Sequence, residues 1–290
     1  MDIITKIYNI AISTMEAPVT LGAFHLSFVA AFIVLTALAV LLFKNCSDKT
    51  LRFITAFVWV VILLLEIYKQ VVFCLYLEDG VFSWDYAWYI FPFQFCSSPL
   101  YIFPIIAFSS NEKLRQRCIA YMMTFSLFAG LAVFCYPNDV FVVTTGINYQ
   151  TMIHHGSQIL MGVLYGARYR AKLSAKFFLG GVRIFVVMVF IAMLLNVGSH
   201  YLFQLTGIDE TFNMFYISPF HECTLPVLNT VWHKLPYVPF VCVYFFGFIL
   251  CALIMFTLFR VFTKGSRVGI RSRKARKLAY ERDCVFYYGM

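Results

Sequence analysis

Seven long apolar segments constrain the fold of this chain more than any other feature. They run over residues 20–43, 51–77, 88–109, 117–136, 150–168, 177–205 and 237–262. A helix needs about 20 apolar residues to cross a hydrocarbon core of about 30 Å, and each segment is close to that length or longer. We therefore expect an all-α fold, a polytopic membrane bundle of seven transmembrane helices.

The composition agrees with a membrane protein and excludes several other classes. Hydrophobic residues make up 61% of the chain and charged residues 13%, whereas soluble domains average about 45–50% and about 25%. So few charges cannot cover a water-facing surface, which excludes a soluble enzyme, a disordered regulator and a secreted disulfide scaffold. The formal net charge of +9 is therefore interpreted as membrane topology, and no nucleic-acid partner is expected.

The distribution of basic residues predicts the orientation. Of the 23 Lys and Arg residues, all except Lys6, Lys69 and Lys234 lie in or beside alternate connections, or after the last segment. Because basic residues are retained on the cytoplasmic side, we expect the N-terminus outside and the C-terminus inside. The chain then consists of a membrane domain, 1–262, and a basic cytoplasmic tail, 263–290. The tail would act as a topological anchor or contact anionic lipid headgroups.

The polar side chains inside the predicted segments fall in the outer half of the bilayer. They include His25, Glu66, Gln94, Cys96, His155, Gln158, Asn196 and His200. Ionisable groups are costly in lipid and usually mark a functional site, so we expect a polar cavity open to the outer face or the outer leaflet. Two of these residues have an equally good structural explanation. Glu66 can pair with Lys69, and His25 can bond to a neighbouring helix.

The third segment is unusual because it contains Pro92, Pro99 and Pro104. A proline inside a helix removes a backbone hydrogen bond, and broken helix at membrane depth is tolerated where it lines a cavity. Cys96 lies in this segment, about 12 Å deep at about 1.5 Å per residue. Gln94 can share a site with Cys96 only if the helix is distorted there.

Two adjacent histidines in the fifth segment can supply the base that a nucleophilic cysteine requires. His154 and His155 point about 100° apart on a helix, so one of them is expected to face the cavity. His155 shares a helix face with Gln158. The pattern therefore favours His155 as the base for Cys96.

No motif in the chain predicts a metal or a cofactor, and we expect neither. The 9 cysteines form no C-x-x-C pair, and the fingerprints of zinc proteases, serine hydrolases, P-loops and dinucleotide-binding sites are absent. One metal alternative stays open, in which His25, His155 and His200 would supply three ligands in the outer half of the membrane.

Two stretches carry a family likeness. FPFQFCSSPLYIFPIIAF (91–108) resembles the P-x-Q/H-x-C signature of YwaF-type integral membrane proteins, bacterial relatives of a mammalian multispanning phospholipid acyltransferase. IHHGSQILMGVLYG (153–166) resembles the histidine–glycine helix of that family. His25 and Asn196 match a histidine and an asparagine of its first and sixth spans. The sequence departs from the pattern at Ser97, where the family often has an aspartate.

The resemblance implies transfer of a fatty acyl group between phospholipids through a thioester on a cysteine. Cys96 would be the nucleophile and His155 the base, with Gln94 or Asn196 donating hydrogen bonds to the oxyanion. The other polar residues, His25, Glu66, Gln158 and His200, would line the substrate site. The expected partners are phospholipids and lysophospholipids in the bilayer, and the reaction needs no cofactor.

Two other functions remain open from the sequence. A seven-span solute or ion transporter would use the same polar cavity as its binding site, although the chain shows no internal repeat of the kind that transporters often have. A membrane lipid hydrolase would use the same cysteine–histidine pair with water as the acceptor. The sequence does not separate a hydrolase from a transferase.

Overall fold

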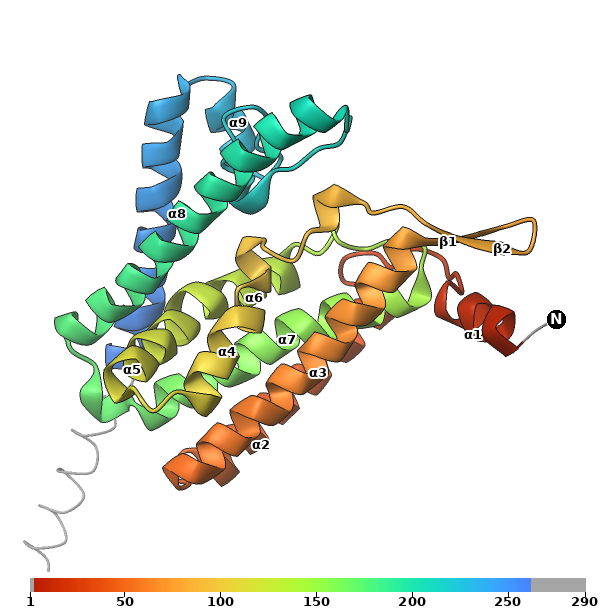
Figure 1. Cartoon of the computed structure of the whole chain (residues 1–290). Coiled ribbons are helices and arrows are strands. Elements are labelled where there is room, and N and C mark those ends of the chain that lie inside the picture. The colour runs from red at the N-terminus through yellow and green to blue at the C-terminus, as the bar shows by residue number, and fades with distance from the viewer. Residues whose placement is uncertain (1–2, 262–290) are drawn as a thin grey trace, which may run out of the picture.

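In the computed structural model, which describes residues 3–261, the protein is a helical bundle with one short β-hairpin (Figure 1). Five helices in this part are long and apolar enough to cross a membrane. They are α2 (Ala23–Phe43), α3 (Asp48–Cys74), the continuous helix from α5 to α6 (Glu112–Cys135), α8 (Ala175–Thr206) and the helix Tyr237–Val261, called the last helix below. These helices confirm a helical, multi-pass membrane protein. The predicted tail, 263–290, lies outside the described residues.

The remaining elements are shorter or more polar. They are α1 (Ile3–Ala11), β1 (Leu75–Glu78), β2 (Val81–Trp84), η1 (Trp88–Ile90), η2 (Phe95–Ser97), α4 (Pro99–Phe108), α7 (Thr145–Arg168), η4 (Arg170–Lys172), η5 (Met214–Tyr216) and α9 (Leu228–Trp232). The antiparallel hairpin of β1 and β2 follows α3 directly. A π-helical turn, η3 (Met122–Ser126), separates α5 (Glu112–Tyr121) from α6 (Leu127–Cys135). Such turns are frequent at functional sites.

The third and fifth predicted segments differ from ordinary apolar spans. The third is broken into η1, η2 and α4, and its longest helix has only 10 residues. The fifth is a continuous helix, α7, but it is more polar than the five apolar helices. It packs against α2, α3 and α6, and His154, His155 and Gln158 on it are all buried. A helix enclosed by protein can carry polar side chains that lipid would not accept.

Helices α6 and α7 approach each other closely at two glycines. A methyl group at Gly130 would lie 2.8 Å from the carbonyl oxygen of His155, and one at Gly162 would lie 2.8 Å from Cβ of Leu127. Both distances are too short for real contacts. Small residues let membrane helices pack backbone against backbone, and here they place α7 next to the π-helical turn.

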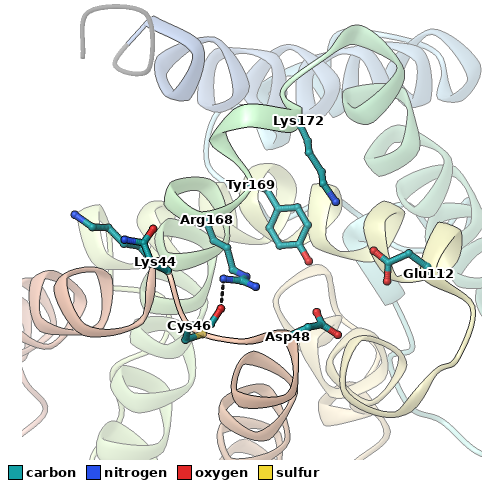
Figure 2. A pocket seen from close by; sticks show the side chains of 8 residues that line it. Lys44, Cys46, Asp48, Glu112, Arg168, Tyr169 and Lys172 are labelled. Carbon is teal, nitrogen blue, oxygen red and sulfur yellow. Dashed lines mark hydrogen bonds between the residues drawn. The ribbon is translucent and has the colours of Figure 1, made fainter. Parts of the chain in front are cut away.

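Three helices begin at the same end of the molecule, which we call the basic end. The side chains of Ser47, Asn111 and Ser174 accept hydrogen bonds from the backbone three residues on, and so cap α3, α5 and α8. A hollow of about 620 Å³ at this end is lined by the connections that follow α2 and α7 and by the starts of α3 and α5. Its residues are Lys44, Asn45, Cys46, Asp48, Glu112, Arg168, Tyr169 and Lys172 (Figure 2). The chain therefore returns to one end between successive helix pairs.

Arg115 connects three elements at the basic end through ion pairs and a hydrogen bond. Its side chain is 1% exposed, bonds to Asp48 at 2.9 Å and to Glu112 at 2.5 Å, and donates to the carbonyl of Ile106 at 3.0 Å. These contacts join the start of α3, the end of α4 and the start of α5. A buried arginine is stable only when its donors are paired in this way, so the two carboxylates are committed to Arg115.

Candidate functional site

The distortion predicted in the third segment is present. After η1 the backbone is extended to Gln94, whose φ and ψ are −80° and 164°; η2 then carries Cys96, and Pro99 is the first residue of α4. Two carbonyls of this segment accept from side chains. Tyr101 donates to Pro92 in the extended stretch at 2.8 Å, and Trp59 donates at 3.0 Å to Leu100, whose helical partner would be Pro104. Broken backbone inside a membrane protein requires such partners.

Two side chains of α7 hold the backbone of Cys96. Nε2 of His154 lies 2.9 Å from the carbonyl oxygen of Cys96, and Nε2 of Gln158 donates to the same oxygen at 2.7 Å. The thiol-bearing residue of the broken segment is thereby joined to the polar face of the central helix. Sequence reasoning singled out Cys96 and Gln158, but it assigned this neighbourhood to His155 rather than His154.

The hydrogen bonds fix the tautomers of both histidines. Because a carbonyl oxygen only accepts, the nitrogen that faces it must carry the proton. Nε2 of His154 faces the Cys96 carbonyl, and Nδ1 of His155 lies 2.7 Å from the carbonyl of Thr151. The opposite nitrogens, Nδ1 of His154 and Nε2 of His155, are buried and have no hydrogen-bond partner. Each neutral ring therefore keeps one free basic lone pair, and the ring centroids are 5.4 Å apart.

An ion pair on α3 lies beside this group. Lys69 binds Glu66 at 2.8 Å, and Gln70 donates to Glu66 at 2.7 Å and to the carbonyl of Ile90 at 3.1 Å. Glu66 thus takes part in the structural pairing that the sequence left as one of two interpretations. Helix α3, which carries this pair, packs against α7, the helix of His154 and His155.

The side-chain amides of Gln94 and Asn196 both bond to the backbone of the loop at residues 213–215. Gln94 donates to the carbonyl of Asn213 at 3.0 Å and accepts from the N–H of Phe215 at 2.9 Å. Asn196 donates to the carbonyl of Met214 at 2.9 Å and accepts from its N–H at 2.6 Å. Each amide keeps one further N–H. The loop in turn packs Phe215 against Phe95, with ring centroids 5.6 Å apart, next to Cys96.

The hydrogen bonds of His25 and His200 go to residues outside the group around Cys96. Nδ1 of His25 accepts from Leu21 at 3.0 Å, and its Nε2 donates to the carbonyl of Phe134 at 2.9 Å. His200 stacks on Phe220 at 3.5 Å and bonds to Gln204 at 3.1 Å. In residues 3–261 no group of three or more His, Cys, Asp or Glu side chains has the geometry of a metal site. The three-histidine alternative is therefore unsupported.

Sequence reasoning missed Tyr244 on the last helix. Its side chain is 1% exposed, yet its hydroxyl has no hydrogen-bond partner. Its ring centroid lies 4.5 Å from that of Phe248, which lies 4.7 Å from the ring centroid of Phe95, the residue before Cys96. The chain has 18 Tyr, and nothing in the sequence distinguishes this one from a tyrosine that faces lipid.

The sequence was also compared with known proteins. A model of the TMEM164 family matches residues 20–260. No curated protein and no solved structure matches the chain. The matched range contains the broken segment, the central helix, the loop at Met214 and most of the last helix, so the whole of the Cys96 site lies inside it.

Proposed function

The chain belongs to the TMEM164 family, and from this premise and the site geometry we propose that it is an integral membrane phospholipid acyltransferase that works through a thioester on Cys96. One observation carries the proposal. A cysteine in a broken membrane segment is held by the central helix, where two histidines are fixed with free basic lone pairs. The resemblance of 91–108 and 153–166 to acyltransferase relatives gives the reaction class.

In the first half-reaction the Cys96 thiol attacks the ester carbonyl of a phospholipid. Nε2 of His155 takes the thiol proton, and the new S–C bond forms as the C–O bond of the ester breaks. The proton then passes from His155 to the departing oxygen, which leaves as the hydroxyl of a lysophospholipid. The hydrogen bond from Nδ1 of His155 to Thr151 supports this role, since it holds the lone pair on Nε2.

In the second half-reaction a lysophospholipid hydroxyl resolves the acyl-enzyme. His155 takes the proton of that hydroxyl, the oxygen attacks the thioester carbonyl, and the C–S bond breaks to return the thiolate, which recovers the proton. Both half-reactions exchange one ester-type bond for another, so no nucleotide or other energy source enters the balance. The unpaired acceptors of His154, His155 and Gln158 suit a ligand that brings a hydroxyl donor.

The developing oxyanion needs hydrogen-bond donors, and such a donor is typically worth about 10²–10³ in kcat. The unpartnered hydroxyl of Tyr244 is one candidate, because it has no hydrogen bond to give up. The remaining N–H groups of Gln94 and Asn196 are the other candidates. Their first N–H groups are committed to the loop, so these two residues also position the site.

We propose that all seven segments traverse the bilayer, with the N-terminus outside. Support comes from the hollow at the basic end, which is lined by the connections that follow α2 and α7 and by the start of α5. This arrangement supports a third segment and an α7 that each run from one end of the bundle to the other. Contact of the tail, 263–290, with anionic headgroups remains part of the same proposal.

The direct test is acyl exchange in a defined membrane. The full chain is reconstituted with one phospholipid and an isotope-labelled lysophospholipid, and mass spectrometry follows labelled diacyl product and the intact mass of the protein. Wild-type protein should form product and carry an acyl adduct on Cys96. Cys96→Ala should abolish both, whereas Cys135→Ser, a change at an exposed cysteine, should leave both unchanged. Full exchange by Cys96→Ala would refute the thioester.

The two histidines are separated by parallel variants. His155→Gln should remove the base and lower the rate of acyl-adduct formation by about 10²–10⁴-fold, the usual contribution of general base catalysis. His154→Gln keeps a donor for the Cys96 carbonyl and should have a smaller effect. The reverse order would assign the base to His154. Release of free fatty acid without exchange would identify a hydrolase, and solute uptake without lipid turnover a transporter.

A further inference from the structure

A second hollow lies at the basic end, between α5 and α8, and it is lined by an unusual set of charges. Its volume is about 270 Å³. Its lining includes Lys113, Arg117, Lys172, Lys176 and Arg183, and it includes no carboxylate. Five cations therefore face one small space. This hollow is distinct from the Cys96 site, which the third and fifth segments form.

The five cations have no acidic partner within residues 3–261. None of them takes part in an ion pair there. Two carboxylates at the basic end, Asp48 and Glu112, are bound by other arginines: Asp48 by Arg52 and Arg115, and Glu112 by Arg115. Lys172 contacts the ring of Tyr169 at 5.3 Å instead. Like charges that converge without a counter-charge repel one another, so the hollow favours an anion.

The N-terminus of α8 adds further positive charge to the hollow. Ser174, which lines the hollow, is the N-cap of a helix of 32 residues. The first N–H groups of a helix point outward from its N-terminus, and the aligned peptide dipoles place partial positive charge there. The anion would thus meet side-chain cations and helix N–H groups together. Orientation of the chain in the membrane requires basic residues in a connection, but it does not require them to converge on one hollow.

We propose that this hollow binds a phosphate monoester group, either as the headgroup of an anionic lipid or as a free phosphate ester. A monoester carries up to two negative charges and presents three acceptor oxygens, which suits five cations better than the single charge of a phosphodiester. The hollow is smaller than the clefts of about 300–1,000 Å³ that take drug-sized ligands. Its volume of about 270 Å³ is enough for a phosphate group.

The surface beside the hollow favours the lipid source. Leu179, Val186 and Val187 on α8 are 51%, 43% and 53% exposed, so the apolar face of α8 begins about one turn beyond its N-cap. A lipid whose acyl chains lie along this face would bring its headgroup to the level of Lys176 and Arg183. A site for phosphatidic acid at this position would be independent of acyl transfer at Cys96.

The test compares ligands and matched charge variants of the full chain in detergent. Binding of dioctanoyl phosphatidic acid, dioctanoyl phosphatidylcholine and glycerol 3-phosphate is measured by native mass spectrometry and by the thermal shift. The variant Lys176→Gln/Arg183→Gln removes two cations from the hollow. The control Lys49→Gln/Arg170→Gln removes two exposed cations outside it, so the net charge changes equally. Size-exclusion chromatography checks that both variants fold.

We expect phosphatidic acid to bind wild-type protein and the control alike, and the hollow variant about 30-fold more weakly. That factor corresponds to about 1 kcal/mol for each basic residue at a lipid surface. Equal binding of glycerol 3-phosphate would identify a soluble phosphate ester as the ligand; binding of phosphatidic acid alone would identify the lipid. Phosphatidylcholine can bind at the proposed Cys96 site, so its affinity should be the same in all three proteins. An equal loss of phosphatidylcholine and phosphatidic acid binding in the hollow variant, or equal losses in both variants, would overturn the site.

Discussion

At the scale of single residues, the polar atoms of the site divide into those that have a hydrogen-bond partner and those that do not. Tyr244 is the clearest case, because a fully buried hydroxyl without a partner costs free energy and is rare in folded proteins. Core packing alone would be served equally well by phenylalanine. The proposed role as an oxyanion donor would account for a tyrosine that packs against Phe240 and Phe248.

Removal of the Tyr244 hydroxyl should change the rate of the reaction without lowering the stability of the protein. Tyr244→Phe removes an O–H that makes no hydrogen bond, so the thermal unfolding temperature should stay the same or rise slightly. The rate of acyl-adduct formation should fall by about 10²–10³-fold if the hydroxyl stabilises the oxyanion. Intact-mass kinetics and thermal unfolding on the same samples measure both quantities.

The control is a tyrosine whose hydroxyl is engaged. Tyr165 is fully buried and bonds to Thr55 at 2.8 Å, so Tyr165→Phe should cost about 1 kcal/mol of stability and leave the rate of adduct formation nearly unchanged. If Tyr244→Phe behaves in the same way as Tyr165→Phe, the hydroxyl of Tyr244 has a structural role only.

At the scale of elements, the loop at η5 supports the broken segment. Phe215 and Tyr216 have φ of 58° and 57°, a left-handed conformation that costs about 1–3 kcal/mol for each non-glycine residue. Gln94 from the third segment and Asn196 from α8 hold this strained loop through its backbone. The loop therefore transmits the position of α8 to the segment that carries Cys96.

Loss of the α8 contact should release the loop. Asn196→Leu leaves the N–H of Met214 unpaired, at about 1–3 kcal/mol for a buried group, and removes one of the two donors to its carbonyl, which still accepts from the N–H of Ile217 at 3.4 Å. We expect a lower unfolding temperature together with slower acyl transfer. Gln204→Leu, farther along α8 at an exposed position that bonds only to His200, should change neither. Normal activity of Asn196→Leu at a temperature where it is folded would show that the loop does not position Cys96.

At the scale of the whole molecule, the basic connections and the capped helix starts lie at the same end. The capped starts of α3, α5 and α8 lie at one end, where Arg115 joins three elements. The hairpin of β1 and β2 lies at the other end of α3 (Figure 1). If every segment crosses, all connections of the basic end lie in the cytoplasm.

Epitope tags test this arrangement. Tags inserted at Gly80, in the hairpin turn, at Asn45 and at Ser110 are probed with antibody on intact and permeabilised cells. Seven spans with an outer N-terminus predict that only the Gly80 tag is reached in intact cells, because the basic connections stay inside. Exposure of Ser110 together with Gly80 would mean that the broken third segment does not cross. Exposure of Asn45 and Ser110 without Gly80 would reverse the orientation.

By itself the sequence determined that the chain lies in a membrane and is helical. It also predicted the break in the segment that carries Cys96. Hydrophobicity and charge act on each segment separately, so the five apolar helices and the basic connections could be predicted from local pattern. The prolines around Cys96 likewise predicted a break, because proline removes its hydrogen bond wherever the rest of the chain lies.

Only the tertiary structure decided which polar atoms meet. The partners of the Cys96 carbonyl, His154 and Gln158, lie 58 and 62 residues away in the sequence, and Gln94 reaches a loop 121 residues away. A period of 3.6 residues shows which face of a helix a side chain occupies, but not what stands opposite that face. His154 was therefore underrated, and Tyr244 was missed. The hydrogen bond between His154 and Cys96 and the burial of Tyr244 both arise between helices, so they exist only once the helices are packed.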